Sequence, residues 1–319
     1  MIKQIAVEPE VMASWIHFRE IWADCGVDQG RLLSEYPKDW RDQVCRHAQA
    51  ASSVKAASIS AKLKPPPGQR AQKRWIPSHR QFDKGKDWLN NAEQSHQPEP
   101  FHAIVAKKNP RDRGNVLVAG EFNKDQPPWK INTQLEIPRT PTRLLECVKV
   151  LLSFSDELIL VDPHFSPDED RFLEPFAVMV ASRPSSKQWR RLELHVAYPI
   201  HLGKPDLDVI NNRKDCFTRL LSPKIPSGNT LQVLFWCRKP QGKRLHPRFI
   251  MTEHGGVQYD VGLDKGDSIH DTTLVNLMAY SVWEQARSDY GMDGEDSIAF
   301  ELGPGGTLTI QGTAQANRH

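Results

Sequence analysis

The sequence predicts an α/β fold in which a mixed sheet is flanked by helices, with a small helical module at the N-terminus. From about residue 100 onward, short apolar runs alternate with amphipathic stretches, a pattern typical of strands separated by helices. The first 50 residues show a helical period instead. The chain has 319 residues, of which 39% are hydrophobic, so it is long enough to bury a core.

The N-terminal module, residues 1–50, is expected to be a pair of helices. In the first helix, apolar residues recur at spacings of four, three and four, at Val11, Trp15, Phe18 and Trp22. The second covers residues 39–51. A stripe of this kind typically packs into a core, and a partner-binding face is the alternative.

Residues 51–100 are expected to form a basic, proline-containing arm or linker. The stretch 51–82 carries seven Lys and Arg residues, no acidic residue, and the run Pro65-Pro66-Pro67-Gly68, which favours an extended chain. Clustered cations gain free energy by releasing counterions from nucleic acid. The residues expected to bind phosphate here are Lys64, Arg70, Lys73, Arg74 and Arg80. A solvated linker is the alternative, and Trp75 and Phe82 can either stack on bases or anchor the arm.

Residues 101–319 are expected to form the main α/β domain. The expected strands are FHAIVA (101–106), NVLVAGEF (115–122), ELILV (157–161), LELHVAYP (192–199), TLQVLFWC (230–237), RFIMTE (248–253) and GVQYDVGL (256–263). A terminal hairpin is expected from residues 298–302 and 307–312. The expected helices cover residues 140–154, 168–182, 206–221 and 272–290. Thr140 is a plausible N-cap, with Pro141 at the favoured first position.

Two polar clusters follow or begin strands of this domain, where ligands collect in open α/β sheets. The first is Asp162-Pro163-His164, and the second runs from His246 to Glu253. His246 and Arg248 share a parity, so a strand projects both to the same face. An imidazole beside a guanidinium suits a phosphate group, because Arg can bind two of its oxygens at once.

These clusters resemble the phospholipase D superfamily. His246-x-Arg248-x4-Glu253 is similar to its HxK(x)4D signature. The closer similarity is to the branch found at the C-terminus of MIT-domain proteins and in prokaryotic defence proteins. There a DPY-like element is resembled by Asp162-Pro163-His164, an HDR strand by His246-Pro247-Arg248, and a GLD-like element by Gly262-Leu263-Asp264. The resemblance covers roughly residues 140–290.

The resemblance implies a protein that contacts or cleaves phosphodiesters of nucleic acid without a metal or cofactor, as part of an antiphage system. His246, Arg248 and Glu253 are then the candidate catalytic residues, and His164 a further phosphate-binding residue. The sequence departs from catalytic members: Arg248 replaces Lys, Glu253 replaces Asp, and only one motif is present. Catalytic members use two copies, so the sequence implies either a homodimer or a non-catalytic phosphate-binding or scaffold subunit of a larger complex.

Composition excludes several classes. The net charge of +3 excludes a uniformly basic coat, although a local patch remains compatible with it. The sequence contains no apolar run long enough to insert into a membrane and no secretory signal pattern. The five cysteines form no CxxC pair, which favours a reducing, cytoplasmic compartment over a disulfide framework or zinc ribbon.

Overall fold

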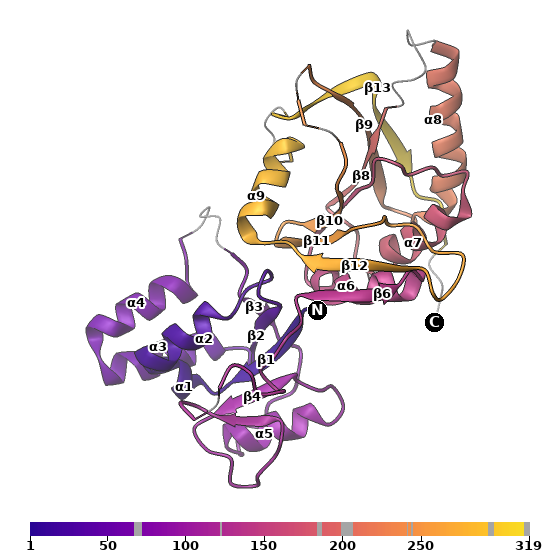
Figure 1. Cartoon of the computed structure of the whole chain (residues 1–319). Helices are drawn as coiled ribbons and strands as arrows, with labels where there is room; N and C mark the ends of the chain where they lie inside the picture. Colours follow the sequence, from indigo (N-terminus) through magenta and orange to yellow (C-terminus); the bar gives the residue numbers. More distant parts are fainter. Residues whose placement is uncertain are drawn as a thin grey trace. The chain divides into compact units, whose positions relative to one another are not determined.

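The computed structural model describes residues 1–66, 72–121, 123–183, 187–198, 207–240, 242–243, 245–292 and 297–315. The chain forms two compact units, residues 1–133 and residues 134–319, and each is described by itself (Figure 1). Both are α/β, with sheets flanked by helices. No helix among the described residues has the length and apolar character needed to cross a membrane.

Unit 1, residues 1–133, is built on a five-stranded sheet in the order β3-β2-β1-β4-β5, in which every pairing is parallel. Its strands are β1 (Lys3–Val7), β2 (Arg31–Glu35), β3 (Trp75–Pro77), β4 (Ala103–Ala106) and β5 (Val116–Val118). Its helices are α1 (Pro9–Ala13), α2 (Trp15–Ala23), α3 (Trp40–Ala51), α4 (Ser53–Leu63) and α5 (Trp88–His96).

Helices cover both faces of this sheet, as a parallel sheet requires. Ile5 and Val7 of β1 join the core that α1 to α4 build, whereas Ala6 points to the opposite core, which includes Leu89 and Ala92 of α5. This alternation explains why β1 reads as a continuous apolar run and not as an alternating one.

The boundaries expected at residues 50 and 100 are wrong, because strands from all three expected segments share one sheet. β1 pairs on one side with β2 and on the other with β4, which the sequence analysis assigned to the main domain. Residues 51–100 are not an extended arm, since they contain α4, β3 and α5. Only the sheet as a whole buries the apolar faces of these elements.

Unit 2, residues 134–319, has an eight-stranded mixed sheet in the order β13-β9-β8-β7-β10-β11-β12-β6. Its strands are β6 (Gln134–Pro138), β7 (Glu157–Val161), β8 (Arg191–Ala197), β9 (Thr230–Arg238), β10 (Arg248–Thr252), β11 (Gly255–Tyr259), β12 (Thr272–Leu277) and β13 (Phe300–Gln311). The neighbours β7, β8 and β9 run parallel, and the remaining pairings are antiparallel.

The helices of unit 2 are α6 (Pro141–Ser153), α7 (Asp170–Val180), α8 (Leu207–Leu221) with the short 3₁₀ helix η2 (Ser222–Lys224), and α9 (Tyr280–Asp289). Figure 1 shows α9 on one side of the sheet and α7 and α8 on the other. Val161, Phe249 and Met251 pack toward α9 around Trp283. The alternate residues of β7 and β10 therefore face α6 and α7.

Two expected elements of unit 2 are wrong. The helix expected over residues 272–290 is the strand β12 followed by α9, because residues 272–277 pair with both β6 and β11. The terminal hairpin is the single strand β13. It pairs with β9 on both sides of a register shift between Leu302 and Thr307. The glycines lie in this shift, and Gly305 and Gly306 have positive φ there.

Candidate functional site

Strand directions in unit 2 bring three sequence-distant segments to one edge of the sheet. β10 runs antiparallel to β7, with Phe249 opposite Val161, so β10 begins where β7 ends. β11 runs antiparallel to β10 and ends at the same edge. The residues after β7, those before β10 and those after β11 therefore converge, as the clusters in the sequence suggested.

His246 and Arg248 lie side by side at this edge. Arg248 Nη1 is 3.4 Å from Nδ1 of the exposed His246 ring and 3.4 Å from the carbonyl oxygen of Asp260. The guanidinium only donates, so Nδ1 accepts and Nε2 of His246 carries the proton. Arg248 Nε is buried and has no hydrogen-bond partner among the described residues. The pair thus presents hydrogen-bond donors that an anion would satisfy.

Asp162 underlies this pair and organises the turn after β7. Its side chain is 1% exposed and accepts the backbone N–H of His164 at 3.0 Å and that of Leu263 at 3.1 Å. Burial raises the pKa of Asp162, while the two N–H donors and the positive charge of Arg248 act in the opposite direction. The carboxyl group therefore ties the DPH segment to the GLD segment beneath the exposed pair.

The Gly262-Leu263-Asp264 segment is packed against the same carboxyl group. A Cβ at Gly262 would come within 2.5 Å of Asp264 Oδ1, so a side chain does not fit there without a shift. Asp264 is buried and pairs with Arg139 and Arg171. Sequence reasoning missed both arginines. The available signal was that Arg139 directly precedes Thr140, the expected N-cap of the helix over residues 140–154.

Glu253 does not join the site, which corrects its expected catalytic role. It follows the opposite end of β10, where five residues of strand separate it from Arg248 by roughly 16 Å. Its carboxylate accepts the backbone N–H of Asp156 at 2.7 Å and of Glu157 at 3.1 Å. Glu253 therefore holds the start of β7 against the end of β10 and cannot orient the His246 ring.

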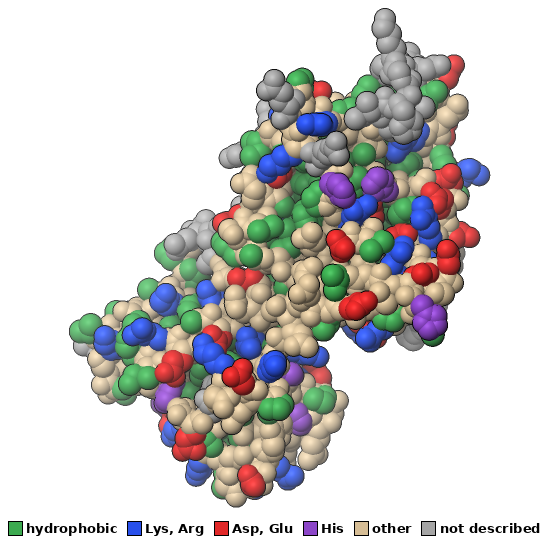
Figure 2. Space-filling model, viewed as in Figure 1, with side chains coloured by type: hydrophobic (Ala, Val, Ile, Leu, Met, Phe, Trp, Pro, Cys, Tyr) green, Lys and Arg blue, Asp and Glu red, His purple; other side chains and the backbone are tan. Residues whose placement is uncertain are grey.

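His164 lies at the same sheet edge as His246. Its side chain is exposed, and its backbone N–H is fixed by Asp162. Figure 2 shows two histidine side chains close together on the exposed surface of unit 2, with Lys or Arg side chains beside them. Histidine and basic side chains on this surface are thus accessible to an anion, with acidic side chains also nearby.

A second arginine, Arg213 of α8, reaches the carboxyl end of the neighbouring strand. Its Nη2 donates to the Ala197 carbonyl at 3.3 Å, and its Nε is buried with no partner among the described residues. Burial lowers the pKa of Arg213, and nearby groups, including Asp168, raise it. The backbone N–H of Ala197 in turn donates to the Pro163 carbonyl, beside Asp162. Sequence reasoning missed Arg213, which lies in the helix expected over residues 206–221 and 33 residues before His246.

The cations expected to bind nucleic acid in unit 1 are largely engaged within that unit. Arg74 donates to the carbonyls of Trp22 and Cys25, at 2.6 Å for Trp22, and Lys64 pairs with Asp42. Lys73 lies over the Trp75 ring at 5.9 Å. Arg70 lies outside the described residues. Arg74 is thus a structural residue that joins the end of α2 to the start of β3.

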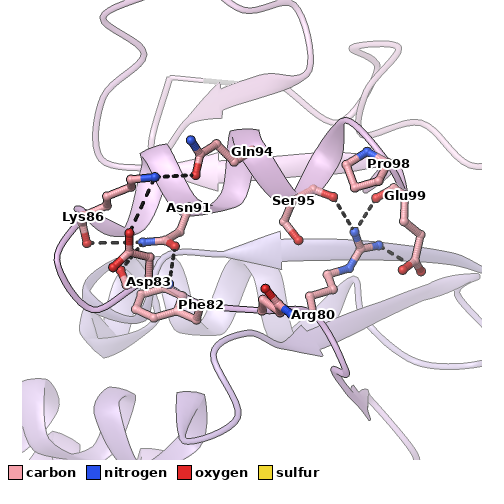
Figure 3. A pocket seen from close by; sticks show the side chains of 10 residues that line it. Arg80, Phe82, Asp83, Lys86, Asn91, Gln94, Ser95, Pro98 and Glu99 are labelled. Atoms are coloured by element: carbon pink, nitrogen blue, oxygen red, sulfur yellow. Dashed lines mark hydrogen bonds and ion pairs between the residues drawn. The ribbon is translucent and has the colours of Figure 1, made fainter.

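Arg80 is also held internally, at one wall of a cavity of about 590 Å³ (Figure 3). It donates to the Ser95 carbonyl at 2.8 Å and to the Glu99 carbonyl, pairs with the Glu99 carboxylate at 3.1 Å, and lies 3.8 Å from the Phe101 ring centroid. At the other wall, Asn91 binds the backbone around Asp83. The polar groups drawn in Figure 3 thus bind one another, which leaves few of them for a ligand.

No grouping of three or more metal-ligating side chains occurs among the described residues. All five cysteines are free, and burial raises the pKa of Cys25 to about 12, so this thiol stays protonated. No protein-family model matches the chain, and no curated protein matches it either. The site must therefore be judged on its own geometry.

Proposed function

We propose that unit 2 is a phospholipase D-like domain that binds the phosphate of a nucleic-acid backbone through His246 and Arg248, without a metal ion. The observation that carries the proposal is the contact between these two side chains at an exposed sheet edge, with Arg248 Nε unpartnered among the described residues. An oxyanion placed there would accept from the guanidinium and from His246 Nε2. The resemblance also suggests a cytoplasmic defence complex as the setting.

Binding is favoured over cleavage by the position of Glu253. A histidine nucleophile or general acid gains basicity and a fixed tautomer from a neighbouring carboxylate. Glu253 serves the far end of β10, and the buried Asp162 accepts two backbone N–H groups. Neither carboxylate hydrogen-bonds to the His246 ring. The described residues therefore supply donors for a phosphate, and neither of these two carboxylates relays a proton to His246.

The test is binding of a double-stranded oligonucleotide in EDTA, measured by fluorescence anisotropy with the full chain. Charge-assisted hydrogen bonds contribute about 1.5–3 kcal/mol, so Arg248→Gln should weaken binding by about 10- to 100-fold, and His246→Ala by a smaller factor. Lys149→Gln removes an exposed charge of α6 from the same unit and serves as the control. Equal affinities for wild type, Arg248→Gln and His246→Ala would refute the proposal.

Metal-independent cleavage is the second candidate, and the exposed His164 at the same edge favours it, since two histidines can share the work of nucleophile and acid. A second His246 from a homodimer would serve the same role. Cleavage that persists in EDTA and is lost in both His164→Ala and His246→Ala would establish this function. Cleavage lost only in His246→Ala, together with a dimer in solution, would point to the second chain.

A further inference from the structure

Unit 1 carries an aromatic groove that the site in unit 2 does not use. The groove has a volume of about 580 Å³ and lies on the outer side of α2, bordered by Lys62 of α4. Trp15, Phe18 and Trp22 line it, and Ile16 at its edge is 67% exposed. The stripe that the sequence analysis assigned to the core is therefore divided: Phe18 is buried, while the two tryptophans remain partly exposed.

The rings form a ladder. Trp15 and Phe18 stack with centroids 6.1 Å apart and planes 7° apart, and Phe18 and Trp22 stack at 5.1 Å and 16°. Trp75 of β3 continues the series at 5.9 Å from Trp22. The ammonium of Lys55, on the exposed side of α4, lies 5.2 Å from the Trp15 centroid. Helix spacing and packing thus hold a row of rings, with Lys55 over Trp15 and Arg74, 5.2 Å from the centroid, over Trp22.

The indole N–H groups separate these tryptophans from the others. Six of the nine tryptophans donate the indole N–H to an acceptor within their own unit, namely Trp40, Trp88, Trp129, Trp189, Trp236 and Trp283. Among the described residues, the indoles of Trp15, Trp22 and Trp75 find no such acceptor, and none of the three is buried. A buried Trp normally satisfies this donor, whereas these three are partly exposed and do not need an acceptor within the protein.

The polar lining of the groove consists mainly of donors. Arg19 and Lys62 are exposed at its border, with the indoles between them. Among the described residues that line the groove, Glu20 supplies the one carboxylate, which lies 3.8 Å from His17 Nδ1. Figure 2 shows Lys and Arg side chains beside hydrophobic ones over α4. A matching ligand offers flat apolar surface, hydrogen-bond acceptors and negative charge.

We propose that this groove binds single-stranded nucleic acid, with bases against Trp15 and Trp22 and phosphates on Arg19 and Lys62. Bases supply flat rings and acceptors, and the backbone supplies charge at regular spacing. All residues that line the groove belong to unit 1, whereas His246 belongs to unit 2. An acidic, aromatic peptide is the alternative occupant that the experiment must separate.

The experiment measures the affinity of the full chain for a labelled twelve-nucleotide oligo-dT. Loss of one stacked base corresponds to about a 5- to 150-fold weaker affinity, which is expected for Trp22→Leu and for Trp15→Leu. Trp22→Phe keeps a ring face and should retain most of the binding. The melting temperatures of the Phe and Leu variants are compared as a folding control. If Trp22 is merely structural, the two variants should bind oligo-dT equally well whenever their melting temperatures are equal.

The charges are tested by the salt dependence. The double variant Arg19→Gln, Lys62→Gln should reduce the slope of log K against log salt by about 1.4, since each phosphate contact to a single strand contributes about 0.7. The control Lys38→Gln, Lys84→Gln removes two exposed cations elsewhere in unit 1 and should leave the slope unchanged. His246→Ala should leave the affinity for oligo-dT and its salt dependence unchanged. Loss of binding at the groove can therefore be told apart from loss of binding at the His246 site. Unchanged affinity in both Leu variants, or binding of an acidic peptide with no binding of oligo-dT, would overturn the proposal.

Discussion

For single residues, the neighbours of a charged side chain decide whether it can serve a ligand. Arg74 and Arg80 each bind backbone carbonyls in unit 1, whereas Arg248 leaves a buried Nε without a partner among the described residues. The sequence shows the cations but not these neighbours, because the acceptors come from segments up to 52 residues away. His246 and Arg248 were expected on one face from strand parity, and their side chains do meet, although His246 precedes β10 and lies outside the strand.

His195 illustrates a histidine that is structural. It is fully buried, its Nδ1 accepts the Trp236 indole N–H at 2.9 Å, and its Nε2 lies 2.9 Å from Glu193 Oε2. Since Trp236 can only donate, the Nε2 proton faces Glu193. Arg191 donates to the other carboxylate oxygen at 2.6 Å. This network satisfies a carboxylate inside the sheet of unit 2.

The Glu193 network makes stability depend on pH. Burial would raise the pKa of Glu193, but His195 and Arg191 outweigh it and lower the pKa from 4.5 to about 2. A depressed folded-state pKa contributes stability above pH 4.5 that is lost as the pH falls toward 2. The wild type should lose on the order of 2 kcal/mol more than Glu193→Gln between pH 6 and pH 3, measured by urea unfolding. Parallel losses in the two proteins would contradict the assigned role.

Helices and strands were predictable where a local signal, such as an N-cap or a hydrophobic period, marks them. Strands that form only by pairing with distant strands were not. The helix expected over residues 140–154 is confirmed as α6, and the strand expected at 157–161 is β7. Residues 272–277 were assigned to a helix, although β6 and β11 pair with them on both sides. Their alternating burial is a strand pattern that appears only once both partners are known.

The contribution of the N-cap of α6 to stability can be measured by substitution. Thr140 accepts the backbone N–H of Arg143 and precedes Pro141 at the first helical position. Thr140→Ala should lower the free energy of unfolding by about 1 kcal/mol, because one end donor loses its acceptor. Thr142→Ala makes the same change at an exposed position in the first turn and should cost far less. Equal effects of the two substitutions, measured by urea unfolding, would show that the cap contributes nothing.

At the level of the whole molecule, the boundary between the two units was not predictable from the sequence. A composition change near residue 51 marks the basic stretch, but β4 and β5 complete the sheet that β1 begins. Sheet order is set by pairing between distant segments, which a local pattern does not encode. The DPH and His246–Arg248 clusters of unit 2 were predictable because the ends of their strands meet at one edge of the sheet. The separation of Glu253 from His246 was not, because it depends on the direction of β10.

The observed boundary predicts how fragments behave. Residues 1–133 contain a complete five-stranded sheet with cores on both faces, so this fragment should fold and unfold cooperatively. A fragment of residues 1–100 lacks β4 and β5 and leaves one side of β1 unpaired, so it should aggregate or melt without a cooperative transition. Circular dichroism melts of both fragments provide the comparison. Cooperative melting of the shorter fragment would support the boundary at residue 100 instead.

The central place of β1 has a consequence for biosynthesis. Ile5 pairs with Leu33 on one side and with Ala103 on the other, so β1 needs a partner that is synthesised 98 residues later. Until Ala103 leaves the ribosome, an apolar strand edge stays open to other chains. The slow step in making this protein is therefore expected to be the wait for β4, and chaperones that cover strand edges should act during that interval.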